Sequence, residues 1–415
     1  MYGKEWVHLR IDNFNQSVEM KKTELLMAMS FLFAACGPKG VETPSGVDCI
    51  DLSTDAGTVE QKIKSISVVN FEVDDSWAFI NQSMMTMTSN RYVFGHKDGK
   101  RLLMYDMEGK KVVDRSIQGR GPGELCYVND IFAVDDKVYC YDSGMDQLIS
   151  YDENGRYVSK WAFDDASDYL YRMGDGFAGL SNLRDDYVYV YDSELKMSDK
   201  HLPLDEFFKY NTTSYGLNPI SYLYNDSLRL MLAYDYIIYS LSNGSFIPRF
   251  EFVTENSIPS SLYKKYEGEY QNSLDLLVDL MKGGYDNGFS SLAETDRYLF
   301  FEYFSSKGGN KSCLYDKRDK KLYRSFYPEQ PVEEDDASGI TCTDVWQYMI
   351  YYLQPAYSDG ESVWFSISKD IYDVLKLRAD ILDDRLKFLY QEITRYMTDN
   401  TLSSGDLLIL RVEFE

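Results

Sequence analysis

The residues best suited to chemistry lie in one glycine-rich segment. Residues 118–125 read Gln-Gly-Arg-Gly-Pro-Gly-Glu-Leu. Three glycines and a proline cannot occupy the interior of a helix or a central strand, so the segment is a shaped loop. Its backbone N–H groups could form an anion-binding nest, with the Arg120 guanidinium as a fork for carboxylate or phosphate. The favoured alternative is structural: the glycines supply positive φ angles in a connection between two β-units. No Gly-Lys-Ser/Thr follows, which argues against a phosphate-loop enzyme.

Side chains for metal or nucleophilic catalysis are scarce. After residue 35, the only histidines are His96 and His201. This leaves little for a zinc hydrolase with two or three His ligands, or for a Ser-His-Asp triad. Acidic clusters at residues 164–165, 185–186 and 333–336 lack the regular spacing of a calcium loop and are interpreted as solvated. No metal or cofactor is predicted, but a calcium ion in the central channel, held by Asp and Asn side chains from several blades, is left open.

Aromatic residues are abundant, with 36 Tyr and 22 Phe. Trp77, Trp161, Trp346 and Trp364, together with the tyrosines, could build a surface that stacks on sugars or binds peptides. The alternative is that they pack in the core, which is the usual role of aromatic residues on strands.

A repeated pattern positions these side chains. Runs of β-branched or aromatic residues end at Tyr105, Tyr151, Tyr191, Tyr239 and Tyr315, each followed by a polar turn. A period of about 40–50 residues, with about four strands per unit, is typical of propeller blades. Five blades are predicted, at about residues 83–118, 127–163, 169–204, 219–252 and 289–327.

A sixth blade is split between the two ends of the chain. Residues 346–353, 362–368 and 407–414 supply three predicted strands, and residues 63–71 supply the last. The sequence therefore predicts an all-β, six-bladed β-propeller whose ring is closed by N- and C-terminal strands. Two inserted amphipathic helices are expected within residues 260–282 and 370–397. These helices either pack on the blades or dock another protein.

The N-terminal region has the features of a processing signal. Lys21-Lys22 precede an apolar run that ends in Ala-Ala-Cys36 and is too short to span a bilayer. This arrangement resembles a bacterial lipoprotein signal peptide, although Phe33 departs from the usual Leu, Val or Ile. The resemblance implies that Cys36 is lipidated as the first mature residue; a plain secretory signal or a buried helix is the alternative. Met20 is the predicted true start, with residues 1–35 as signal region, 36–60 as tether and 61–415 as propeller domain.

Charge and cysteine content exclude several classes. The formal net charge is -24 with a pI near 4.6, so the chain lacks the basic surface that nucleic acid or anionic lipid requires. Five cysteines besides Cys36 are widely spaced and odd in number, which gives neither a disulfide framework nor a Cys-x-x-Cys metal site. Cys140 alternates with tyrosines and is predicted to be a core residue.

The glycine-rich loop also carries a family resemblance. Residues 119–124, following the first Tyr-Asp-x-x-Gly turn, resemble the six-bladed β-propeller lipoproteins of Gram-negative anaerobes, relatives of NHL-repeat propellers. The chain departs from that pattern at Leu125, where an aromatic residue is common, and at Leu195, which replaces a turn glycine. The resemblance covers about residues 62–415. It implies a cell-envelope location and no settled reaction.

Together these observations predict an exported, membrane-anchored module of the cell envelope, periplasmic or associated with the outer membrane. It is expected to bind a glycan, a peptide or an envelope protein, and no nucleic acid. Arg120, Glu124, Arg172 and Arg184 are the candidate ligand-binding residues, and no catalytic residue is assigned. The alternative is a metal-assisted lyase or hydrolase with a carboxylate-lined central channel.

Overall fold

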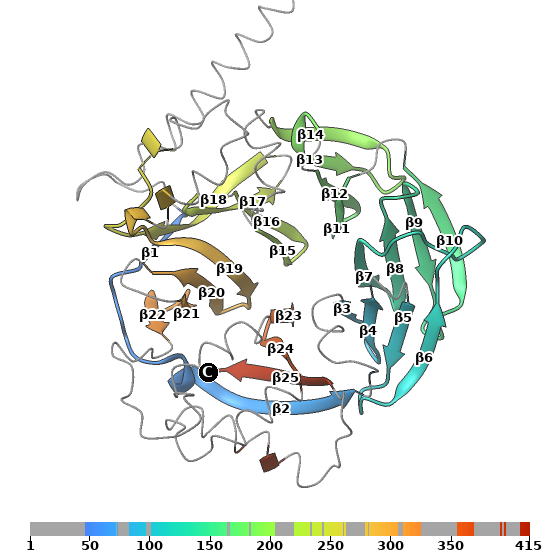
Figure 1. Cartoon of the computed structure of the whole chain (residues 1–415), viewed down its shortest axis with the longest axis horizontal. Coiled ribbons are helices and arrows are strands. Elements are labelled where there is room, and N and C mark those ends of the chain that lie inside the picture. Colours follow the sequence, from blue (N-terminus) through green and yellow to red (C-terminus); the bar gives the residue numbers. More distant parts are fainter. Residues whose placement is uncertain are drawn as a thin grey trace, which may run out of the picture.

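Six β-sheets surround a common axis in the computed structural model (Figure 1). The structure describes residues 46–71, 73, 83–96, 101–163, 167–181, 184–203, 220–232, 235–242, 245–259, 261–262, 279–280, 282–305, 310–324, 355–368, 391, 394–395 and 407–415. The sheets are the blades of a six-bladed β-propeller, which confirms the predicted fold.

The first three blades are continuous in sequence, and each runs from an inner to an outer strand. Blade one contains β3 (Ser83–Met87), β4 (Tyr92–His96), β5 (Arg101–Tyr105) and β6 (Lys111–Ser116). Blade two contains β7 (Asp130–Val134), β8 (Lys137–Asp142), β9 (Gln147–Tyr151) and β10 (Tyr157–Ala162). Blade three contains β11 (Tyr169–Met173), β12 (Gly176–Leu180), β13 (Asp186–Tyr191) and β14 (Met197–Pro203).

Blades four and five follow the same order, whereas blade six draws on both ends of the chain. Blade four contains β15 (Ile220–Tyr224), β16 (Ser227–Met231), β17 (Ile237–Ser242) and β18 (Ser245–Val253). Blade five contains β19 (Asn287–Glu294), β20 (Tyr298–Phe304), β21 (Asn310–Asp316) and β22 (Lys321–Arg324). Blade six contains β23 (Pro355–Ser358), β24 (Ser362–Ser368), β25 (Leu407–Phe414) and β2 (Ile63–Phe71).

Local sequence explains the tight turns between the first two strands of a blade. Asp135-Asp136 and Asn225-Asp226 occupy two such turns with positive φ at both positions, 47° and 58°, and 47° and 56°. Two-residue hairpins favour this geometry because its twist matches that of the strands, and Asn and Asp tolerate it better than most residues.

The ring closes through pairing of the two chain ends. Strand β2 runs antiparallel to β25, with Ile63 opposite Phe414 and Phe71 opposite Leu407. Figure 1 shows these two strands, blue and red, side by side in one blade. The pairing confirms the predicted closure.

The segment before β2 covers the outer edges of two further blades. Strand β1 (Asp48–Asp51) pairs in parallel with β18 of blade four. The chain then passes β22 of blade five, where the Ala56 amide donates to Leu322 and Gly57 accepts from the Arg324 amide. Residues 48–51, predicted to lie in a tether, are thus part of the propeller. Their alternation of exposed and buried side chains is that of a short edge strand.

Several predicted elements lie wholly or partly outside the described residues. The predicted strand at 346–353 lies outside them, and the inner strand of blade six is β23, which begins at Pro355. Proline is tolerated there because it is the first residue of an edge strand. Within the two predicted helix ranges, the described helical residues are 261–262, 279–280, 282, 391 and 394–395. No helix in the described part of the chain is long and apolar enough to cross a membrane.

Aromatic side chains fill the seams between blades. Phe71 of blade six makes edge-to-face contacts with Tyr92, Phe94 and Tyr105 of blade one, at centroid distances of 4.9–5.3 Å. Trp364 is buried in the same cluster. Cys140 is fully buried, as predicted, and burial raises the pKa of its thiol. Much of the aromatic content is therefore core.

In blades one to three, the turn before the outer strand rests on the preceding blade. A Cβ on Gly109 would lie 2.1 Å from the Asn70 carbonyl oxygen, and one on Gly155 would lie 2.6 Å from Val113. The equivalent residue in blade three is Leu195, which has φ 64° and is buried against blade two. At this seam the Leu195 side chain fills space that Gly109 leaves to the Asn70 backbone and Gly155 leaves to the Val113 side chain.

We predict that Gly109→Ala destabilises the ring far more than Gly174→Ala. Both glycines have positive φ, 82° and 49°, but a Cβ at Gly174 would have no atom within 4 Å. Gly174→Ala should lower the free energy of unfolding by about 1 kcal/mol through backbone strain. Gly109→Ala should cost at least about 2 kcal/mol more through the clash with Asn70. Urea unfolding of both variants measures the difference, and equal losses would contradict the packing argument.

Candidate functional site

The glycine-rich loop connects β6 to β7 and binds its own carboxylate. Glu124 Oε2 accepts a 2.7 Å hydrogen bond from the Gly121 amide. The Gly119 amide donates to the Leu125 carbonyl at 3.0 Å. A Cβ at Gly119 would lie 2.0 Å from Glu124 Oε2, so only glycine allows this approach. The chain itself thus supplies the anion that the loop accommodates.

The same loop seals the seam between blades one and two. Ile117 and Leu125 are fully buried in a cluster that includes Met104 of blade one and Ile149 of blade two. The Tyr151 hydroxyl donates to the Gly123 carbonyl at 3.1 Å. These contacts fit the structural interpretation of the loop.

The four predicted ligand-binding residues do not form one cluster. Arg120, which is exposed, and Glu124 share the β6–β7 connection. Arg184 lies in the β12–β13 connection with its guanidinium 4.4 Å from the Tyr189 ring centroid. In an antiparallel blade both connections lie on one side of the ring. Arg172 is instead on inner strand β11, one residue before the turn on the opposite side.

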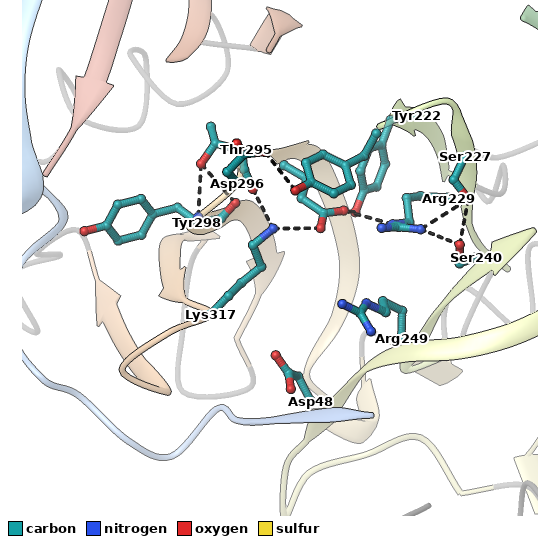
Figure 2. Close-up of polar contacts among 12 residues, drawn as sticks. Asp48, Tyr222, Ser227, Arg229, Ser240, Arg249, Thr295, Asp296, Tyr298 and Lys317 are labelled. Atoms are coloured by element: carbon teal, nitrogen blue, oxygen red, sulfur yellow. Dashed lines mark hydrogen bonds and ion pairs between the residues drawn. The ribbon is translucent and has the colours of Figure 1, made fainter. Parts of the chain in front are cut away.

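A buried charged cluster joins blades four and five. Glu294, at the end of β19, is 2% exposed. Its Oε2 accepts from Arg229 Nε of β16 at 2.9 Å, and its Oε1 accepts from Lys317 Nζ at 2.9 Å. Figure 2 shows Arg229 and Lys317 reaching toward this carboxylate from the two blades. We refer to Arg229, Glu294 and Lys317 as the charged cluster.

Two tyrosines of inner strand β15, Tyr222 and Tyr224, lie beside the charged cluster. The Tyr222 hydroxyl donates to Glu294 Oε2 at 3.2 Å, and the Tyr224 hydroxyl donates to Asp296 Oδ1 at 3.0 Å. Lys317 Nζ lies 4.4 Å from the Tyr224 ring centroid. Burial, then the hydrogen bond to Asp296, raises the pKa of Tyr224 to about 12. Burial lowers the pKa of Lys317, although Glu294 opposes this effect.

Arg229 and Lys317 also donate to other groups of the protein. Arg229 Nη1 donates to the hydroxyl of Ser240, and Lys317 Nζ donates to the Thr295 carbonyl at 2.5 Å. A buried charge set that is satisfied in this way fixes the relation of two blades and leaves few groups for a ligand. Sequence reasoning did not find it because Arg229 and Glu294 are 65 residues apart. The only local signal was a charged residue inside the apolar strand Ser227–Met231.

A second cluster combines aromatic rings with one predicted residue, Arg172. Tyr139 of blade two stacks on Phe132 with a centroid distance of 5.2 Å and on Trp161 at 5.9 Å. Phe132 contacts Phe177 of blade three at 6.0 Å, and the Arg172 guanidinium lies 5.0 Å from the Phe177 ring centroid. Tyr139, Trp161 and Arg172 are half-buried. We call these five residues the aromatic–arginine seam.

Metal-binding side chains do not gather in the described structure. Among the described residues, no three His, Cys, Asp or Glu side chains lie close enough to hold a metal ion. The channel calcium ion and the metal-assisted enzyme, both left open by the sequence, gain no support from these residues.

One known family model matches most of the chain. A family model described as "Domain of unknown function (DUF4934)" matches residues 48–387. The chain is a DUF4934 protein. The match begins at the first residue of β1, which agrees with the placement of that strand in the propeller. No curated protein matches the DUF4934 chain in sequence.

One of the similar solved structures shares the fold of the DUF4934 chain. A "Putative exported protein" from Bacteroides fragilis NCTC 9343 is 17% identical, with a TM-score of 0.65 over 88% of this chain and 99% of that chain. A member of the duf4221 family from Bacteroides vulgatus is 8% identical, with a TM-score of 0.47 over 85% and 97% of the two chains. A catalytically inactive virginiamycin B lyase from Staphylococcus aureus is 9% identical, with a TM-score of 0.39 over 83% and 99%. At 17% identity, the likeness to the Bacteroides fragilis protein concerns the fold alone.

We predict that Glu294→Ala destabilises the protein by about 3–5 kcal/mol, because it leaves two buried cations without their carboxylate. Replacing all three charges, as in Arg229→Met/Glu294→Leu/Lys317→Met, should restore most of that loss. Glu194→Ala is the control, since its 2.6 Å ion pair with Lys196 is about 70% exposed at both side chains. That control should change stability by less than about 0.5 kcal/mol. Denaturant unfolding measures all three, and a triple variant weaker than Glu294→Ala would contradict the explanation.

Proposed function

We propose that this DUF4934 protein is an exported, membrane-anchored β-propeller that binds a glycan, a peptide or an envelope protein. The signal-like N-terminal region ending at Cys36 supports export and lipid attachment. The likeness to a structure described as an exported protein is consistent with this location. The acidic composition fits a protein without a nucleic acid partner.

The aromatic–arginine seam is the observation that carries the proposed binding function. Its half-buried Trp161, which covers one side of Tyr139, offers a ring of the kind that stacks on sugar rings or on aromatic side chains. Arg172 adds a guanidinium for a carboxylate or a polar group, and its Nη1 also donates to the Gly176 carbonyl at 2.9 Å. The charged cluster is less suited to this role because its groups are engaged with one another.

We predict that Trp161→Ala and Arg172→Gln each weaken ligand binding at least tenfold. The loss of one stacked ring or one charge-assisted hydrogen bond corresponds to about 1.4 kcal/mol or more. Glycan and peptide arrays probed with residues 46–415 would supply the ligand, and calorimetry would supply the affinities. Phe304→Ala is the control, since this aromatic residue is 46% exposed on blade five. Unchanged affinity in both seam variants would place the binding site elsewhere.

We predict that Cys36→Ala releases the protein from the membrane. Cells expressing the chain from Met20 would be labelled with an alkyne fatty acid and fractionated. The unchanged protein should carry the label and sediment with membranes, whereas Cys36→Ala should lose both properties because a lipid anchor requires this thiol. Cys126→Ala is the matched control and should keep both. Labelled, membrane-bound Cys36→Ala would refute the anchor.

A further inference from the structure

Inner strand β19 contains an irregular serine. The pairing of β19 with β20 joins Ser290 to Glu302 and then Ala293 to Phe300, so Ser291 and Leu292 have no partner in the register. Ser291 has φ 55°, a conformation that a serine rarely adopts. Bulges of this kind re-aim a side chain, and backbone strain of this kind concentrates at functional sites.

The hydroxyl of Ser291 donates to a buried carboxylate. Ser291 Oγ lies 2.6 Å from Glu302 Oε2, and Ser312 Oγ donates to Glu302 Oε1 at 3.0 Å. Glu302 is 5% exposed, and no Lys, Arg or His among the described residues forms an ion pair with it. Burial raises the pKa of Glu302 to about 7, although both serine hydrogen bonds oppose the shift.

Glu302 differs from Glu294 of the charged cluster in the groups that surround its carboxylate. Glu294 is neutralised by two cations, whereas Glu302 can accept a proton near neutral pH. A hydroxyl within hydrogen-bond reach of a base, with the base oriented by a third group, is the arrangement of an activated nucleophile. Here Ser312 is the orienting group. The bulge places Ser291 and Leu292 outside the paired register of β19 with β20.

We propose that Ser291 is the nucleophile and Glu302 the general base of an acyl-transfer site in blade five that acts on carboxylic esters. The Ser291 proton passes to Glu302 Oε2 while Oγ bonds to the ester carbonyl carbon. The carbon–oxygen bond to the alcohol then breaks, and Glu302 returns the proton to the departing alkoxide. Water then attacks the acyl-serine while Glu302 accepts its proton. The bond between Oγ and the acyl carbon breaks, Glu302 returns the proton to Oγ, and the carboxylic acid leaves. Ser291 is partly exposed, as a nucleophile must be.

A fluorophosphonate probe tests this site directly, because it loses fluoride on bonding to an activated serine. Residues 46–415 should gain one adduct by intact mass, mapped to Ser291 after proteolysis. Ser291→Ala should abolish the adduct, and Glu302→Gln should slow labelling at least about 100-fold by removing the base. Ser198→Ala is the control: its hydroxyl lies on outer strand β14 of blade three and donates to the Val190 carbonyl, so this variant should label as the wild type does.

A second variant tests whether loss of the adduct reflects loss of folding. Ser291→Gly suits a positive φ and should retain the folded protein while abolishing the adduct. An unlabelled wild-type protein, or labelling that survives Ser291→Gly, would overturn the proposal and leave the serines as simple hydrogen-bond donors to Glu302. Hydrolysis of p-nitrophenyl acetate by wild type, absent in Ser291→Gly, would support it independently. Neither result alters the test of the aromatic–arginine seam, which lies between other blades.

Discussion

Burial of both faces of every sheet is the constraint on which this structure depends. A single blade cannot cover its own apolar faces, so the ring must close. Strands from the two chain ends pair in blade six to achieve this. The C-terminal residue is held as well, since Arg297 Nη1 and the Tyr298 hydroxyl of blade five both donate to the Glu415 carbonyl at 2.7 Å. Closure is therefore a contact between neighbouring blades as well as a strand pair.

Blade five uses two buried carboxylates in contrasting ways. Glu294 and Glu302 lie on adjacent strands of blade five, and both are buried. One is compensated by Arg229 and Lys317, and the other only by serine hydroxyls. A paired charge costs little once its partners are fixed, whereas a carboxylate without a cation keeps an affinity for a proton. The neighbours, rather than the residue type, assign a structural role to the first and reactivity to the second.

The space beside the backbone explains where glycine is required and where another residue replaces it. The loop at 118–125 needs Gly119 because the carboxylate of Glu124 occupies the space of a Cβ. In blade three, Leu195 adopts the left-handed conformation and buries its side chain against blade two. The strain of that backbone is offset by apolar burial, which a glycine could not provide. The replacement of a turn glycine by Leu195 thus serves the packing between blades two and three.

The sequence by itself determined the repeat, the blade order and the closing pair of strands, because alternating apolar residues and polar turns are local and periodic. It misjudged residues 48–51, since a short edge strand with exposed acidic residues has the composition of a tether. The charged cluster, the aromatic–arginine seam and the Ser291–Glu302 pair were decided only by the tertiary structure. Their members are brought together by the packing of blades or by an irregular register. A local sequence pattern predicts neither blade packing nor an irregular register, because partners such as Arg229 and Glu294 are distant in the chain.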